Sequence, residues 1–173
     1  MKIRRHGSFR LTLGAMMTVL TVISVYLSAI LPSGKISLLF LSGIFLIPLL
    51  YEREVGGAVL IYIASAILSL LLVPGMINAV PYILFFGHYG IGKYLCEEKK
   101  NTLLSFVFKF IYYNVFMFAC YFLFFDMLAG EFLKGIPFIL LLLMMEVFFF
   151  VYDYLYSGII TLYGKKIKRL ILG

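Results

Sequence analysis

The chain has 173 residues, of which 64% are hydrophobic and 13% are charged, and its formal net charge is +7. Soluble domains carry about 45–50% apolar and about 25% charged residues, so this composition excludes an ordinary soluble domain and indicates an all-α integral membrane protein. In a soluble protein the positive charge would suggest a nucleic-acid partner. We expect none here, because the basic residues lie between long apolar runs, where they report membrane topology.

Six apolar runs predict six transmembrane helices that form a single polytopic domain, residues 1–173. The first run is longer than the apolar core of a usual signal peptide, and Pro32-Ser33-Gly34 leads directly into the second run, so we expect no cleavage. The second run is short and is interrupted by Pro48. The connections are too short for a soluble domain. The expected spans are residues 11–31, 36–51, 55–73, 79–95, 102–125 and 136–163.

The basic residues predict the orientation of these spans. An even number of spans places both termini on one side, and basic residues gather on the cytoplasmic side of membrane proteins. The opposite side would hold only Lys35 and Lys134, while Lys109 lies within a span. Both termini are therefore expected to be cytoplasmic in a multi-pass protein of the cell membrane, here a bacterial plasma membrane. The residues expected inside are Lys2, Arg4, Arg5, Arg10, Arg53, Lys93, Lys99, Lys100, Lys165, Lys166, Lys168 and Arg169.

The sixth run carries two acids, Glu146 and Asp153, in a setting where acids are costly. Seven residues separate them, which returns a helix to nearly the same face. An ionisable group within the membrane needs a partner, water or a ligand, and is therefore a candidate for a functional site. The two acids either bind a ligand or lock helices together, and the sequence leaves both interpretations open.

The other polar residues of the membrane interior lie in the fourth and fifth runs. His88 either makes a helix-packing hydrogen bond or contacts a ligand, and Lys109 either extends to the membrane surface or pairs with Asp153. Asn114 is also expected to contact a ligand. Spans one to three carry no charge in their interiors, so we expect the second half of the chain to hold something polar. Aromatic walls for this candidate substrate site are Tyr112, Tyr113 and Tyr121.

No cofactor or metal site is expected. Gly87 to Lys93 matches the spacing of a phosphate-binding loop, but Tyr94 stands where that loop needs Ser or Thr, and a membrane span precedes it. Lys93 is better interpreted as an anchor at the inner membrane surface. Cys96 and Cys120 form no disulfide, zinc or haem pattern.

The chain resembles the S components of energy-coupling-factor transporters, the small substrate-capturing membrane subunits for vitamins and related nutrients. The resemblance rests on six spans in under 200 residues, on Leu13-Gly14-Ala15-Met16-Met17-Thr18, and on Leu31-Pro32-Ser33-Gly34-Lys35-Ile36-Ser37. It implies an S-component-like bundle with a ligand toward the outer side among spans four to six. It also implies that small residues of the first span meet a coupling protein. The family often has alanines four apart there, whereas this chain has Ala15 and Val19, so Gly14, Ala15 and Thr18 are the expected contacts.

The leading interpretation is therefore a substrate-binding subunit of a small-nutrient importer, driven by a separate transmembrane coupling protein and ATPase subunits. The alternative is a membrane scaffold of bacterial cell-shape or envelope machinery, which needs no ligand. An enzyme is not expected, since no acids are paired at metal-ligand spacing and no nucleophile has an evident base.

Overall fold

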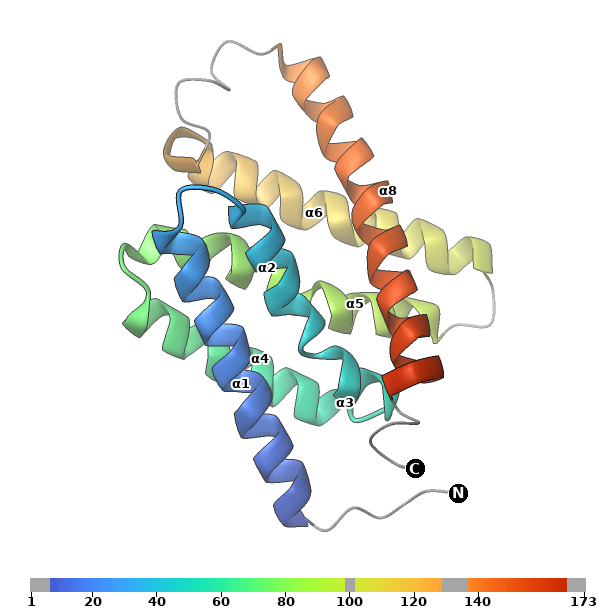
Figure 1. Cartoon of the computed structure of the whole chain (residues 1–173). Helices are drawn as coiled ribbons and strands as arrows, with labels where there is room; N and C mark the ends of the chain where they lie inside the picture. Colours follow the sequence, from blue (N-terminus) through green and yellow to red (C-terminus); the bar gives the residue numbers. More distant parts are fainter. Residues whose placement is uncertain (1–6, 99–101, 129–136, 168–173) are drawn as a thin grey trace. The chain divides into compact units, whose positions relative to one another are not determined.

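The structure of the protein is a computed structural model that describes residues 7–98, 102–128 and 137–167. Every regular element in these residues is helical, in agreement with the all-α prediction (Figure 1). The elements are α1 (Gly7–Ile30), α2 (Lys35–Ile44), α3 (Ile47–Tyr51), α4 (Val55–Leu72), η1 (Met76–Ala79), η2 (Tyr82–Phe86), α5 (Gly87–Glu97), α6 (Thr102–Leu128), α8 (Phe138–Leu162) and η3 (Tyr163–Ile167).

Three helical stretches in the described residues are long and apolar enough to cross a membrane: Leu11–Ile30, Val55–Leu72 and Leu142–Lys165. They correspond to the first, third and sixth predicted spans. Lys35–Tyr51 and Leu103–Phe116 are apolar but shorter. Several basic residues lie outside the described residues: those in the termini, Lys99 and Lys100, and Lys134. The topology inferred from them therefore remains a prediction.

The chain divides into two compact units, Met1–Ile91 and Gly92–Gly173, and each is described by itself. In the first unit α1 packs against both α2 and α4. A hydroxyl seam lies buried among these helices, and within it Thr21 Oγ1 of α1 donates a hydrogen bond to the Ser42 carbonyl of α2 at 3.5 Å. Small side chains permit such close approach where the bilayer supplies no hydrophobic drive. The buried hydroxyl residues are Thr18, Thr21, Ser24, Ser28, Ser42, Ser65 and Ser69.

Prolines and glycines lie at the ends of the helices of the first unit, and those at Gly34 and Pro48 were expected from the sequence. Gly34, with a φ of 80°, precedes α2, and Pro48 stands in the first turn of α3, just after the break that separates α3 from α2. Pro74 and Gly75 follow α4. Gly75 has a φ of 70°, a backbone conformation that residues with a Cβ rarely adopt. The fourth predicted span is less regular than expected, because η1 and the π-helical η2 precede α5.

The second unit has an aromatic interior. The rings of Tyr113 on α6 and Phe149 on α8 lie 4.5 Å apart between centroids, and the ring of Phe110 lies 5.9 Å from that of Phe149. Tyr113 and Phe149 are at most 1% exposed. Tyr152 and Tyr156 continue the buried face of α8 toward its C-terminal end. Aromatic pairs at these spacings stabilise a helix contact beyond the area that they bury.

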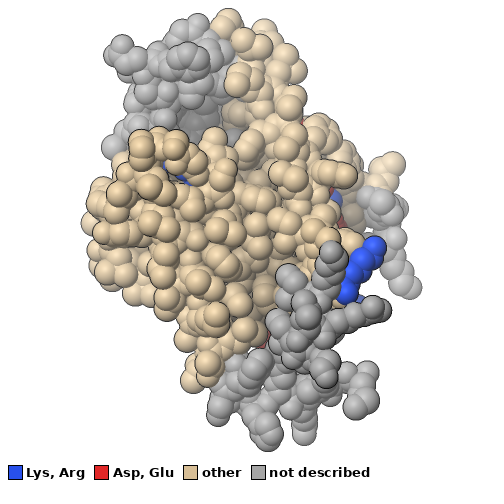
Figure 2. All heavy atoms as spheres, viewed as in Figure 1, with Lys and Arg blue, Asp and Glu red and all other residues tan. Residues whose placement is uncertain are grey.

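Large apolar side chains face outward from both units. Leu71 on α4, Ile139 on α8 and Tyr154 on α8 are each more than 70% exposed. Among the described residues seen in Figure 2, most of the visible atoms belong to uncharged residues, with a few basic and acidic atoms between them. Many exposed apolar side chains are unfavourable in water, whereas hydrocarbon chains cover them without cost.

Candidate functional site

Four charged side chains of the second unit meet in one group, which we call the ion-pair cluster: Lys93, Glu97, Lys109 and Asp153. Lys93 and Glu97 belong to α5, Lys109 to α6 and Asp153 to α8. The cluster therefore joins three helices. Its location is toward the C-terminal ends of α5 and α8 and toward the N-terminal end of α6, about 10 Å along that helix by helical rise.

The cluster is a closed ring in which each acid binds both lysines. Asp153 accepts a hydrogen bond from Lys93 at Oδ1 and from Lys109 at Oδ2, the latter at 3.1 Å. The Oε1 atom of Glu97 lies 2.9 Å from the Lys93 ammonium nitrogen and 2.8 Å from that of Lys109. Two positive and two negative charges make the ring neutral, so each charge has an opposite neighbour.

The members of the ring differ in burial. The side chains of Lys93 and Lys109 are 1% and 10% exposed, that of Asp153 is 20% exposed, and that of Glu97 is 43% exposed. An ammonium group removed from water is stable only with full pairing, because desolvation costs several kcal/mol per ion. Lys93 is the most completely paired, since it also donates to Ser157 Oγ at 2.8 Å.

Local sequence spacing builds the ring. Lys93 and Glu97 are four residues apart on α5, as are Asp153 and Ser157 on α8, so each pair projects from one helix face. Gly92 allows α6 to approach α5: a Cβ at this position would lie 2.5 Å from ring atoms of Tyr112. Tyr112, expected as a ligand wall, thus packs against the backbone beside Lys93.

Three other predicted site residues lie farther toward the opposite ends of α6 and α8. The Tyr113 hydroxyl donates to the Met145 carbonyl at 2.6 Å and ties α6 to α8. Asn114 donates from Nδ2 to the Phe110 carbonyl of its own helix at 3.0 Å. Glu146 is half-buried, and its Oε2 atom is fully buried with no hydrogen-bond partner among the described residues. An unpaired buried carboxylate oxygen is costly, so Glu146 is the predicted residue best placed to receive a ligand.

His88 belongs to the first unit, so it is not brought into the ion-pair cluster. Its Nε2 donates to the Leu84 carbonyl in η2 at 2.6 Å, and its ring meets that of Tyr62 edge-on at 5.9 Å between centroids. These contacts correspond to the helix-packing interpretation of His88. Tyr121 lies on α6, but its side chain lies outside the described residues.

The expected coupling residues occupy two sides of α1. Thr18 is buried and donates to the Gly14 carbonyl at 2.9 Å, and the position of a Gly14 Cβ would be 3.8 Å from Ile61 of α4. Ala15 is exposed, as is Val19 four residues on. Gly14 and Thr18 thus pack within the unit, and Ala15 faces outward.

Lys93 and Glu97 were not predicted as site residues. Lys93 was interpreted as a surface anchor, yet it is the most buried charge in the cluster. The available signal was the Lys-x-x-x-Glu spacing at the end of a membrane helix, which permits an ion pair on one face. The anticipated pairing of Lys109 with Asp153 is present.

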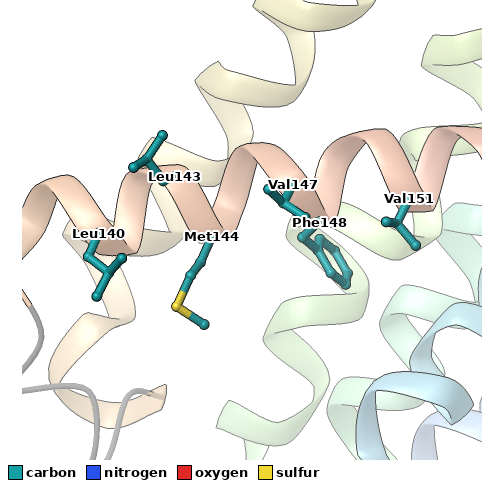
Figure 3. A pocket seen from close by; sticks show the side chains of 6 residues that line it. All are labelled: Leu140, Leu143, Met144, Val147, Phe148 and Val151. Carbon is teal, nitrogen blue, oxygen red and sulfur yellow. The ribbon is translucent and has the colours of Figure 1, made fainter.

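An open apolar hollow of about 520 Å³ runs along α8, and Figure 3 shows its lining. Leu140, Met144 and Phe148 point to the same side of the helix (Figure 3). The hollow contributes no polar side chain to a ligand, so it differs in chemistry from the region around Glu146. Its lining residues are Leu140, Leu143, Met144, Val147, Phe148 and Val151.

In the part of the chain that the structure describes, no three His, Cys, Asp or Glu side chains are placed to hold a metal ion. Comparisons of the chain with protein-family models, curated proteins and solved structures gave no match. The assignment of function therefore depends on the geometry and charges of the chain itself.

Replacing Tyr113 with phenylalanine should reduce stability by about 1–2 kcal/mol, because the Met145 carbonyl loses its part-buried side-chain hydrogen bond while the ring remains. The matched control is Tyr154→Phe, which removes a hydroxyl from a residue that is 79% exposed and should change little. Thermal unfolding of both variants in one detergent checks this. Equal midpoints for the two variants would show that the Tyr113 hydroxyl does not support the α6–α8 contact.

Proposed function

We propose that the protein is the substrate-capturing membrane subunit of a small-nutrient importer. The observation that carries the proposal is Glu146, whose Oε2 atom is buried without a hydrogen-bond partner in the described residues. A carboxylate in this position favours a ligand that is cationic or donates hydrogen bonds. Asn114 occupies the same portion of the second unit and offers an amide oxygen, and Tyr113 beside it ties α6 to α8.

The topology in this proposal has six spans with both termini in the cytoplasm. The three long apolar helices supply spans one, three and six, and α2 with α3, η2 with α5, and α6 supply the others. Under this topology the ion-pair cluster lies toward the inner side and Glu146 toward the outer side, about 12 Å along α8 from Phe138 by helical rise. A ligand that enters from outside would reach Glu146 first.

Energy would come from partners, as in the S components that the chain resembles: a transmembrane coupling protein and ATPase subunits. Support comes from α1, where Ala15, Val19 and Ile23 are all exposed and recur every four residues. This spacing places them on one outward stripe that a partner helix can meet. No catalytic role is assigned to this chain.

The test is native mass spectrometry of the protein purified gently from its own host, with Glu146→Gln beside the wild type. A small molecule bound at one per chain is expected in the wild type and should be lost in Glu146→Gln, which keeps the side-chain shape but removes the charge. Glu98→Gln, at an exposed position at the end of α5, is the control and should retain the ligand. If Glu146→Gln and Glu98→Gln retain the same amount of bound ligand, Glu146 is not part of the binding site.

A membrane scaffold of the bacterial envelope is the second candidate. It is favoured by the ion-pair cluster, in which the charges satisfy one another and need no ligand, and by Asn114, which bonds to its own helix. Purification with envelope proteins and without ligand, coupling protein or ATPase would support the scaffold instead. In that case substitutions on outward-facing residues should impair function more than Glu146→Gln.

A further inference from the structure

We propose that Lys93 and Lys109 form an anion-binding site that the Glu97 carboxylate occupies in this structure, and that an external carboxylate or phosphate group takes its place when Glu97 turns outward. This inference does not depend on the nutrient proposed for Glu146. It assigns a ligand class, a small anionic group, to a different part of the second unit.

The geometry of Glu97 is that of an internal anion bound by two buried cations. A single oxygen, Oε1, lies within 2.9 Å of both ammonium nitrogens, as a phosphate or carboxylate oxygen would. The two lysine side chains are 1% and 10% exposed. These cations are already desolvated and held in position, so an anion that replaces Glu97 does not have to pay for ordering them.

Glu97 differs from Asp153 in how easily it can leave. Asp153 projects from the interior of α8 and is 20% exposed, whereas Glu97 is the last residue of α5 and is 43% exposed. A rotamer change of Glu97 breaks its contacts with both lysines while the three helices stay in place. Asp153 and Ser157 would still hold Lys93.

Charge balance identifies the chemistry of the replacement ligand. Without Glu97 the cluster keeps two ammonium groups and one carboxylate, which leaves one positive charge in a region of low dielectric. That charge favours an anion with oxygen acceptors, because ammonium–oxyanion hydrogen bonds are about twice as strong as neutral ones. Both a soluble anion and the phosphate of an anionic lipid headgroup have this chemistry.

The experiment measures thermal unfolding of the full chain in phosphatidylcholine nanodiscs while inorganic phosphate replaces chloride at constant ionic strength. A second arm keeps chloride and replaces part of the lipid with phosphatidylglycerol. Whichever arm gives a saturable rise in the midpoint identifies the source of the anion. The wild type should show such a rise in at least one arm, since a ligand that binds the folded state raises its stability.

Glu97→Ala should respond at concentrations at least tenfold lower than the wild type, because the tethered carboxylate no longer competes. Glu98→Ala, the adjacent acid outside the ring, should respond like the wild type. The double variant Glu97→Ala with Lys109→Met should lose the response, since one of the two cations is gone.

An absence of any saturable response in the wild type, in both arms, would overturn the proposal and leave Glu97 as a permanent counter-ion. A response that is equal in the wild type and Glu97→Ala would also overturn it, because the anion would then bind elsewhere. Both decisive measurements use only the wild type and Glu97→Ala. They remain interpretable even if the double variant with Lys109→Met fails to fold.

Discussion

Asp153→Asn is expected to lower the stability of the second unit by about 3–5 kcal/mol, because it leaves two buried lysines with one exposed acid. Asp153 is the only member of the ion-pair cluster on α8, so the change also removes the charged link from that helix to α5 and α6. Asparagine is nearly isosteric and can still accept a hydrogen bond at one oxygen. The loss therefore reports the charge more than the packing. Thermal or denaturant unfolding in nanodiscs measures it.

Two further variants separate this effect from a general effect of charge. Glu98→Gln removes an acid from an exposed position at the end of α5 and should change stability by less than about 0.5 kcal/mol. Asp153→Asn combined with Lys93→Met restores neutrality and should recover part of the lost stability, since a buried ion pair can be replaced by apolar groups. A stability loss below about 1 kcal/mol for Asp153→Asn would contradict the claim that the ion-pair cluster stabilises the packing of α5, α6 and α8.

Gly87→Ala is expected to destabilise the first unit by about 2–3 kcal/mol through overpacking. A Cβ at this position would lie 2.8 Å from both Tyr62 Cδ2 and Tyr82 Cζ. Neither ring can easily turn away, because the Tyr62 hydroxyl donates to the Ile83 carbonyl at 2.8 Å and the Tyr82 hydroxyl shares a hydrogen bond with Ser65. Tyr82 is fully buried as well.

The same substitution at Gly158 is the matched control. Gly158 lies within α8 and has nothing within 4 Å of the position of its Cβ. Alanine is favoured over glycine inside helices by about 0.8–1 kcal/mol, so Gly158→Ala should be neutral or slightly stabilising. The thermal midpoint should therefore fall for Gly87→Ala and stay unchanged or rise slightly for Gly158→Ala. Similar shifts for both would show that the gap beside Gly87 closes without strain.

Much of the helix pattern could be predicted because it follows from apolar run length and from proline and glycine. The run 55–73 became Val55–Leu72, and the run 136–163 became Phe138–Leu162, which continues into the π-helical η3. The interruption at η1 and η2 was not predicted. Pro81 directly precedes η2, and the Tyr62 hydroxyl binds the Ile83 carbonyl inside the π-helical turn. Apolar periodicity carries no information about such a tertiary contact.

The candidate site was predicted only in part for a similar reason. Lys109 and Asp153 were recognised because a charge deep in an apolar run stands out by its cost. Lys93 and Glu97 lie near the end of a run, where a charge is inexpensive, so their sequence context matches that of ordinary surface anchors. Lys93 is enclosed by the approach of α6 beside Gly92 and by its contacts with Asp153 and Ser157 of α8, and none of these is visible in the sequence around Lys93.

The break between α2 and α3 has a consequence for the bilayer around the protein. Together these helices cover Lys35–Tyr51, which spans about 25 Å at 1.5 Å per residue, and α4 spans about 27 Å. The hydrocarbon core of an average bilayer is about 30 Å thick. Where these helices cross as proposed, a hydrophobic mismatch of a few ångströms is met by thinning of the neighbouring lipids, by flanking side chains that extend to the surface or by helix association, at a fraction of a kcal/mol per ångström. The apolar part of α1, Leu11–Ile30, spans about 30 Å, so within the first unit the mismatch is confined to these shorter helices.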